Sequence, residues 1–142
     1  MKELGKTKIL VIDDEESIRH YLKLLLEREG FLVDSAGDGE VGLQAVQDSD
    51  YDIILCDIRM PNRDGLGFLE EFRSRLFVGE VVMMSAYGSR DTALEAVKRG
   101  AYDYIDKPIQ RNELLLAIHK LLEREKLRKE NRRLQIALID GY

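Results

Sequence analysis

The chain of 142 residues has one cysteine, two histidines and no long apolar segment. Cys56 cannot form a disulfide within the chain, and its place inside an apolar run favours a small buried core residue over a reactive thiol. No apolar run approaches the length of about 20 residues that crosses a bilayer. Residues 1–6 carry charge and are soon followed by two aspartates, which is not the pattern of a secretory signal. We therefore expect a cytoplasmic protein that makes no contact with a membrane.

A clustered basic face is also missing, because the net charge is -5. The basic residues near the C-terminus are interleaved with glutamates, as on a solvated helix. Nucleic-acid binding needs clustered positive charge to displace counterions from phosphates, so we do not expect direct nucleic-acid binding by this chain. With 44% hydrophobic and 35% charged residues, the length allows one globular domain with an appendage.

Five short apolar runs alternate with segments in which apolar residues recur at helical spacing. Such alternation predicts βαβ units and a doubly wound parallel sheet, that is, an α/β fold. The expected strands are Lys8 to Ile12, Phe31 to Ala36, Tyr51 to Cys56, Val81 to Ser85, and Tyr102 to Ile105.

The last helix begins near Arg111 or Asn112 and shows no stop signal for more than about 25 residues, roughly twice what a small sheet needs. We therefore predict a domain at 7–122 and a projecting linker helix at 123–142. Four positions of this helix follow the four-and-three spacing of a coiled-coil seam, with an asparagine among leucines. They are Leu127, Asn131, Leu134 and Leu138. The spacing indicates a parallel homodimer, and the alternative is a solvated linker helix without a partner.

Acidic, hydroxyl and ammonium side chains close four of the five predicted strands. Asp13 and Asp14 follow the first strand, Asp57 the third, Ser85 the fourth and Lys107 the fifth. The carboxyl ends of parallel strands meet at one edge of a sheet, so these residues are expected to share a crevice. Crowded carboxylates repel one another, and Mg2+ fits them best because it takes few protein oxygens and leaves room for a phosphate oxygen. The ammonium and the hydroxyl would face the same phosphoryl group.

In order and spacing these motifs resemble the receiver domain of two-component response regulators. The resemblance runs from about Lys8 to Leu122 and is carried by Asp13-Asp14, Asp57, Ile58-Arg59-Met60-Pro61, Asp64-Gly65, Ser85-Ala86 and Lys107-Pro108. It implies a flavodoxin-like five-stranded sheet of order 2-1-3-4-5, extended here by the long C-terminal helix. It also implies a switch that accepts a phosphoryl group from a histidine kinase, assists its own phosphorylation and slow dephosphorylation, and is otherwise not an enzyme.

The resemblance assigns a role to each residue of the site. Asp57 would be the phosphoacceptor, and Lys107 would pair with it or with the phosphate. Magnesium would be held by Asp14, Asp57 and the backbone carbonyl of Arg59, with Asp13 reaching the ion directly or through water.

A switch pair is implied as well. The hydroxyl of Ser85 would move toward the phosphoryl oxygen while the ring of Tyr104 turns inward. Tyr102 is the competing aromatic residue, because alternation along a strand would place both rings on the same side. Neither His20 nor His119 ends a predicted strand, and we expect both on helix surfaces.

Three stretches are similar to receivers of sigma-54-dependent, enhancer-binding regulators of the nitrogen-regulation type: Ser85-Ala86-Tyr87-Gly88, Ala93 to Gly100, and Ala101-Tyr102-Asp103-Tyr104. There a long last helix joins the receiver to an ATPase domain and a DNA-binding domain, which implies transcriptional control through an output absent from this chain.

Two functions of other classes stay open beside this one. A magnesium-dependent phosphohydrolase would also use an aspartate nucleophile and a lysine, but the haloacid dehalogenase type needs an aspartate where Arg59 stands. A receiver-like dimerisation module without phosphorylation is the other alternative. A nucleotide-binding module is disfavoured, because the acidic residues after the first strand repel a bare anion.

Overall fold

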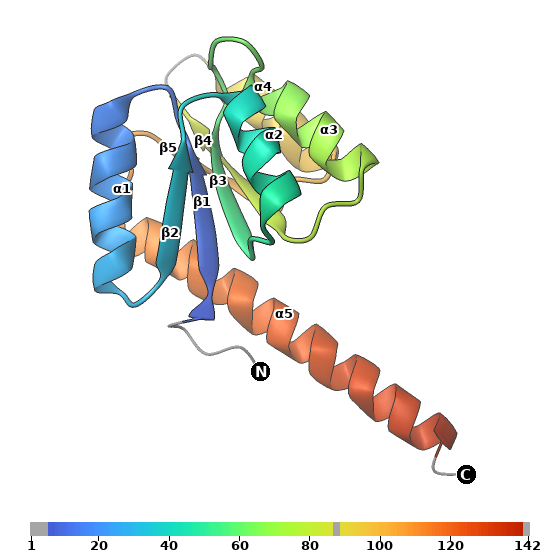
Figure 1. The fold of residues 1–142 in the computed structure, drawn as a ribbon. Coiled ribbons are helices and arrows are strands. Elements are labelled where there is room, and N and C mark those ends of the chain that lie inside the picture. The colour runs from blue at the N-terminus through green and yellow to red at the C-terminus, as the bar shows by residue number, and fades with distance from the viewer. Residues whose placement is uncertain (1–5, 87–88, 141–142) are drawn as a thin grey trace.

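The computed structural model describes residues 6–86 and 89–140, and within these ranges five strands alternate with five helices (Figure 1). The five strands form one parallel sheet of order β2-β1-β3-β4-β5, as the predicted receiver fold requires. The elements are β1 (Lys8–Ile12), α1 (Glu16–Arg28), β2 (Leu32–Ala36), α2 (Gly39–Asp48), β3 (Ile53–Asp57), α3 (Gly65–Ser74), β4 (Glu80–Ser85), α4 (Arg90–Lys98), β5 (Asp103–Asp106) and α5 (Arg111–Asp140). All five predicted strands are present; β1 has the predicted bounds, and one or both ends of the other four are shifted by one or two residues.

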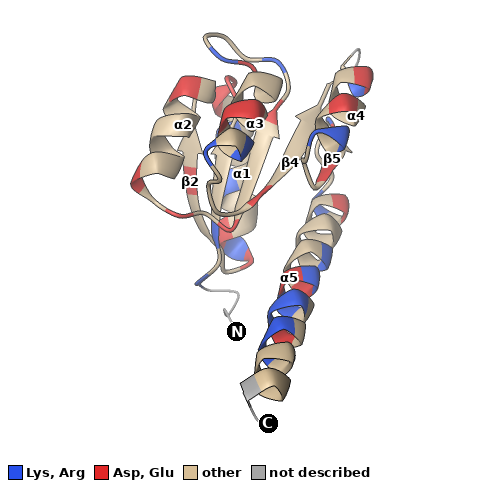
Figure 2. Ribbon diagram, turned by 90° about the vertical axis from the view of Figure 1, so that its right-hand side faces the viewer, with Lys and Arg blue, Asp and Glu red and all other residues tan. Residues whose placement is uncertain are grey.

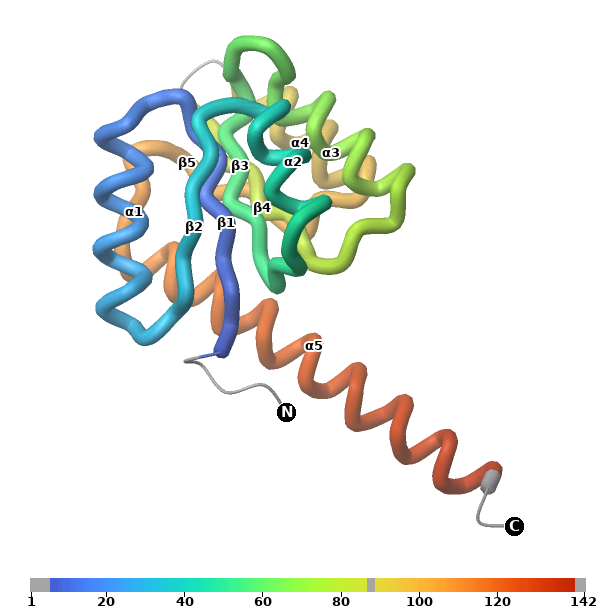
Figure 3. The backbone as a smooth tube through the Cα atoms, viewed as in Figure 1, coloured from blue at the N-terminus to red at the C-terminus, as the bar shows by residue number. Residues whose placement is uncertain are grey.

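The sheet is covered on both faces, which explains why its central strands are continuous apolar runs rather than alternating ones. All five residues of β3 are buried. One hydrophobic cluster joins the sheet to α1 and α5, and a second joins its other face to α2, α3 and α4. The smooth trace in Figure 3 shows these two layers, with α1 on one side and α2 and α3 on the other.

Helix boundaries follow from residues with the required backbone chemistry. The carboxylate of Asp38 accepts a hydrogen bond from the amide of Val41, and Asp64 does the same for Gly67. These N-caps satisfy amides that the first turn of a helix leaves unpaired. After α1, Gly30 adopts a φ of 94°, a region that favours glycine.

The last helix, α5, packs on the sheet only over its first part. Its buried residues are Leu114, Leu115, Ile118 and Leu121. From residue 126 to residue 139 every side chain is exposed. Lys, Arg, Asp and Glu are mixed along the projecting part (Figure 2). No helix within the described residues combines the length and apolar character needed to span a membrane.

Candidate phosphoacceptor and metal site

The carboxyl edge of the sheet brings together the acidic residues that the sequence places far apart. Oxygen atoms of Asp13, Asp14 and Asp57 lie within 4.8 Å of one another, the one such cluster among the described residues. Asp13 and Asp57 are buried, whereas Asp14 is exposed. Two carboxylates of the cluster are therefore buried at the edge of the sheet, and the third is exposed to solvent.

Lys107 lies among these carboxylates. Its Nζ atom is 2.8 Å from Oδ2 of Asp13 and 3.3 Å from Oδ2 of Asp57. The backbone amide of Lys107 donates to the carbonyl of Ser85 at 2.7 Å, so the lysine is anchored to the end of β4. Burial alone would lower the pKa of Lys107, but the hydrogen bond to Asp13 and the charge of Asp57 outweigh it, and the pKa is raised. Lys107 is therefore a stable cation next to Asp57.

The ionised form of Asp57 is disfavoured by its surroundings. Burial, followed by the negative charge of Asp13, raises the pKa of Asp57 from 3.8 to about 6, although Lys107 opposes the change. Removing a carboxylate from water is unfavourable, and a like charge nearby adds to the penalty. A bound cation would relieve that repulsion.

Asp13 is held by hydrogen bonds to its side chain and to its backbone, and its amide donates to the carbonyl of Ala36 at 3.1 Å. Its Oδ1 accepts from the amide of Glu15 at 2.9 Å, and its Oδ2 accepts from Lys107. Its backbone carbonyl accepts from Nη1 of Arg19 at 2.7 Å. The sequence analysis did not identify Arg19, because one arginine on the first helix carries no signal of this contact. Both carboxylate oxygens of Asp13 already have protein donors, so Asp14 and Asp57 are better placed to supply direct metal ligands.

The donor set fits a small hard cation. Three carboxylates supply oxygen ligands alone, which suits Mg2+ and not softer metals. Arg59 lies in the turn directly after β3, two residues beyond Asp57, with an exposed side chain. Gly65 has no side chain for a steric reason, since a Cβ there would overlap the carbonyl oxygen of Asp57 and crowd Cε of Met83.

The hydroxyl of Ser85 is buried at the end of β4. It lies 3.4 Å from the carbonyl oxygen of Ala86 and 3.4 Å from the hydroxyl of Ser89. The Ser89 hydroxyl donates to the same carbonyl at 2.8 Å. Ser85 thus lies at the carboxyl edge of the sheet as the last residue of β4, but its hydroxyl contacts Ala86 and Ser89, just before α4.

The two candidate switch tyrosines lie on opposite faces of the sheet, so the prediction that they share a side is wrong. Tyr104 packs with the cluster that contains α4, and Tyr102 packs with the cluster that contains α1 and α5. The alternation argument fails because Tyr102 precedes β5, which begins at Asp103. Tyr104 is half-buried beside the helix that follows Ser85.

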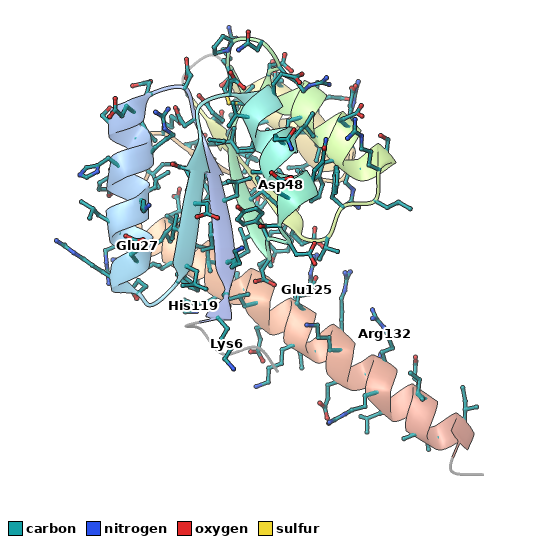
Figure 4. The ribbon with its side chains drawn as sticks, in the orientation of Figure 1. Lys6, Glu27, Asp48, His119, Glu125 and Arg132 are labelled. Atoms are coloured by element: carbon teal, nitrogen blue, oxygen red, sulfur yellow. The ribbon has the colours of Figure 1, made fainter. Side chains whose placement is uncertain are left out.

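The remaining singled-out residues lie away from the acidic edge. His20 and His119 are exposed on helices, as expected (Figure 4 labels His119). Cys56 is fully buried, which confirms the core interpretation, and burial raises the pKa of its thiol well above the usual value. Among the predicted seam residues, Leu127, Leu134 and Leu138 are each more than half exposed in the single chain. Asn131 is exposed as well.

Comparison with known proteins gives a consistent family. Residues 9–119 match the family described as "Response regulator receiver domain". The regulatory protein AtoC of Escherichia coli is 38% identical over 135 residues, which cover 95% of this chain and 29% of AtoC. The transcriptional regulatory protein ZraR of Escherichia coli is 39% identical over 114 residues, which cover 80% of this chain and 26% of ZraR.

Solved structures agree with these sequence matches. The crystal structure of NtrX from Brucella abortus has a TM-score of 0.82 at 36% identity, over 89% of this chain and 29% of that one. A receiver domain protein from Clostridium thermocellum has a TM-score of 0.81 at 34% identity, over 86% of this chain and 98% of that one. The chain spans about 29% of the length of the first curated relatives that it matches. With its sheet order, its acidic edge and a family match over most of its length, the chain belongs to the response regulator receiver domain family.

Proposed function

We propose that this chain is a phosphorylation-controlled switch in which Asp57 accepts a phosphoryl group from a phosphohistidine of a histidine kinase. The observation that carries the proposal is the position of Asp57, which is buried within the acidic cluster, 3.3 Å from the ammonium of Lys107. Membership of the receiver family supports the same reaction.

The chemistry follows from these groups. A carboxylate oxygen of Asp57 attacks phosphorus and forms an acyl phosphate, while the phosphorus–nitrogen bond of the donor breaks and the imidazole nitrogen keeps the electron pair. Lys107 then faces a phosphoryl group in place of a bare carboxylate, and its charge stabilises the oxygens of the transferred group. The raised pKa of Asp57 indicates that the bare carboxylate is poorly stabilised in the folded protein.

Magnesium is the cofactor that the donor set supports. Asp14, Asp57 and the backbone carbonyl of Arg59 would hold it, with Asp13 contributing through water because its own oxygens accept from Glu15 and Lys107. When bound, the ion neutralises charge that gathers on the phosphoryl oxygens.

The switch would operate through Ser85 and Tyr104. The hydroxyl of Ser85 would exchange its contacts with Ala86 and Ser89 for a phosphoryl oxygen, and the start of α4 would change with it. Tyr104, packed on the α4 side of the sheet, would then move into the space that Ser85 leaves. The charge added at Asp57 would thus change the packing on the α4 side of the sheet.

We propose that two copies of the chain form a homodimer through α5. Leu127, Leu134 and Leu138 remain exposed in one chain, and a parallel coiled coil would bury them against their equivalents. Asn131 would lie in the seam and favour two strands in register. We further propose that the chain is the receiver of a transcription regulator of the sigma-54-dependent type, with ATPase and DNA-binding domains as its output. Its similarity to AtoC and ZraR, of each of which it matches less than a third, supports this proposal.

The reaction is tested by intact-mass spectrometry after incubation with acetyl phosphate, with and without magnesium. We expect one phosphoryl adduct that requires magnesium and is absent from Asp57→Asn. Asp106→Asn, at the exposed end of β5 in the same sheet, is the matched control and should be modified like the parent. An adduct that persists in a folded Asp57→Asn variant would show that the phosphoacceptor is another residue.

A further inference from the structure

The projecting part of α5 touches the body of the domain at Arg124, beyond the last fully buried leucine of the helix, Leu121. Arg124 also lies past the boundary at 122/123 that the apolar pattern predicts. Figure 4 follows the helix through His119 beside the sheet to Glu125 and Arg132 on the part that leaves it. The contacts of Arg124 therefore lie where the helix stops being supported.

Two contacts with the body of the domain hold the Arg124 guanidinium, and a third joins it to Oε1 of Glu125 on the same helix at 3.3 Å. Its Nη2 atom is 3.1 Å from Oε2 of Glu80, and its centre is 4.4 Å from the centroid of the Tyr102 ring. Its Nε atom is buried without a hydrogen-bond partner, the one such side-chain atom among the described residues. An arginine can stack flat on a ring and form an ion pair at the same time, which a lysine cannot do equally well. The unpaired Nε indicates that stacking, rather than optimal hydrogen bonding, sets the orientation of this side chain.

Glu80 lies in β4 and Tyr102 lies immediately before β5, and both of these strands end at the acidic edge. Glu80 is the first residue of β4, whose last residue is Ser85. Tyr102 directly precedes β5, which leads to Lys107. The helix is thus attached at the amino ends of the same two strands whose carboxyl ends carry the site.

We propose that Arg124 is the positioning residue that sets the direction in which α5 leaves the receiver. About 25 Å of helix lies beyond it, at 1.5 Å per residue, so a tilt of about 10° at this point moves the far end by about 4 Å. A small change in the Arg124 contacts therefore becomes a large change in where the end of the helix points. This role does not depend on phosphorylation of Asp57.

Other arginines on the helix lack this arrangement. Arg128, one turn further on, pairs with Glu125 of the same helix at 3.7 Å. Arg133 pairs with Glu130, also within the helix. Arg128→Gln is therefore a matched control, since it removes the same charge from the same helix without removing a contact to β4 or to Tyr102.

The test measures the distance between spin labels on Gln47→Cys, at the exposed end of α2, and Gln135→Cys, on the exposed part of α5. Cys56 is fully buried and need not be replaced. Labelled chains are diluted into an excess of unlabelled chains, so that pulsed dipolar spectroscopy reports distances within one chain. We expect Arg124→Gln to at least double the width of the distance distribution, with the Arg128→Gln distribution equal to that of the parent.

Tyr102→Leu is a second variant that removes the stacking surface and keeps an apolar side chain, and we expect it to broaden the distribution as well. Circular dichroism and formation of the magnesium-dependent phosphoryl adduct verify that each variant remains folded. A folded Arg124→Gln protein with the parent distribution would overturn the proposal. So would equal broadening in Arg124→Gln and Arg128→Gln, because the effect would then come from charge on the helix in general.

Discussion

Replacing Asp57 by asparagine should stabilise the protein when magnesium is absent. Asparagine has nearly the shape of a protonated aspartate, and it removes the charge that burial and Asp13 disfavour. Each pKa unit between folded and unfolded chains corresponds to about 1.4 kcal/mol. A rise in pKa from 3.8 to about 6 therefore corresponds to about 3 kcal/mol, or to an increase in Tm of about 10 °C for a chain of this size.

The size of this stabilisation depends on pH in a defined window. Below pH 3.8 Asp57 is protonated in both the folded and the unfolded chain, so the wild type pays no penalty for its charge. Between pH 3.8 and about 6 the unfolded chain releases the proton first, and the wild type loses stability as pH rises. The advantage of Asp57→Asn should thus be near zero at pH 4 and complete at pH 7 to 8.

The assay is urea unfolding of both proteins followed by circular dichroism, in EDTA, at several values from pH 4 to pH 8. Magnesium at about 100 times its Kd should stabilise the wild type by about 2.7 kcal/mol and largely remove the difference. An asparagine variant that is less stable than the wild type at pH 8 in EDTA would refute the reasoning. A gain of the same size at every pH would refute it too, because the cause would then not be the carboxylate charge.

Further outcomes follow from other contacts. Lys107→Ala leaves the fully buried Asp13 without its cation and should lower the free energy of unfolding by about 3 kcal/mol in urea titrations, whereas Lys107→Arg should retain part of it. Gly65→Ala places a Cβ against the carbonyl of Asp57 and should lower both Tm and magnesium affinity, measured by scanning and titration calorimetry, while Gly67→Ala, which has more room, should affect both less. Truncation after Leu122 should convert a dimer into a monomer in light scattering, and an unchanged mass would contradict the coiled-coil proposal. Cys56 should resist maleimide in the folded protein and react fully in denaturant, because its thiol is buried and its pKa is raised.

The sequence alone was enough for the fold and for the identity of the residues at its edge. Strand and helix patterns depend on near neighbours, so an apolar run such as β3 can be recognised without knowing its partners. Polar residues that close such runs, among them Asp57 and Ser85, must then lie at the carboxyl edge of a parallel sheet. The local pattern does not show which face of the sheet a residue outside a strand will pack against. For this reason Tyr102 was wrongly predicted to share a face with Tyr104.

Only the tertiary structure decided how these residues pair. Lys107 and Asp13 are 94 positions apart, and their 2.8 Å contact depends on β1, β3, β4 and β5 taking their places in one sheet. The contacts of Arg124 with Glu80 and with Tyr102 likewise join residues that are far apart along the chain. Pairings of this kind depend on distances across the folded molecule, whereas the periodic patterns that reveal helices and strands depend only on distances along the chain. The sequence therefore determined the elements and the identity of the residues at the carboxyl edge, and tertiary packing determined the raised pKa of Asp57 and the attachment point of α5.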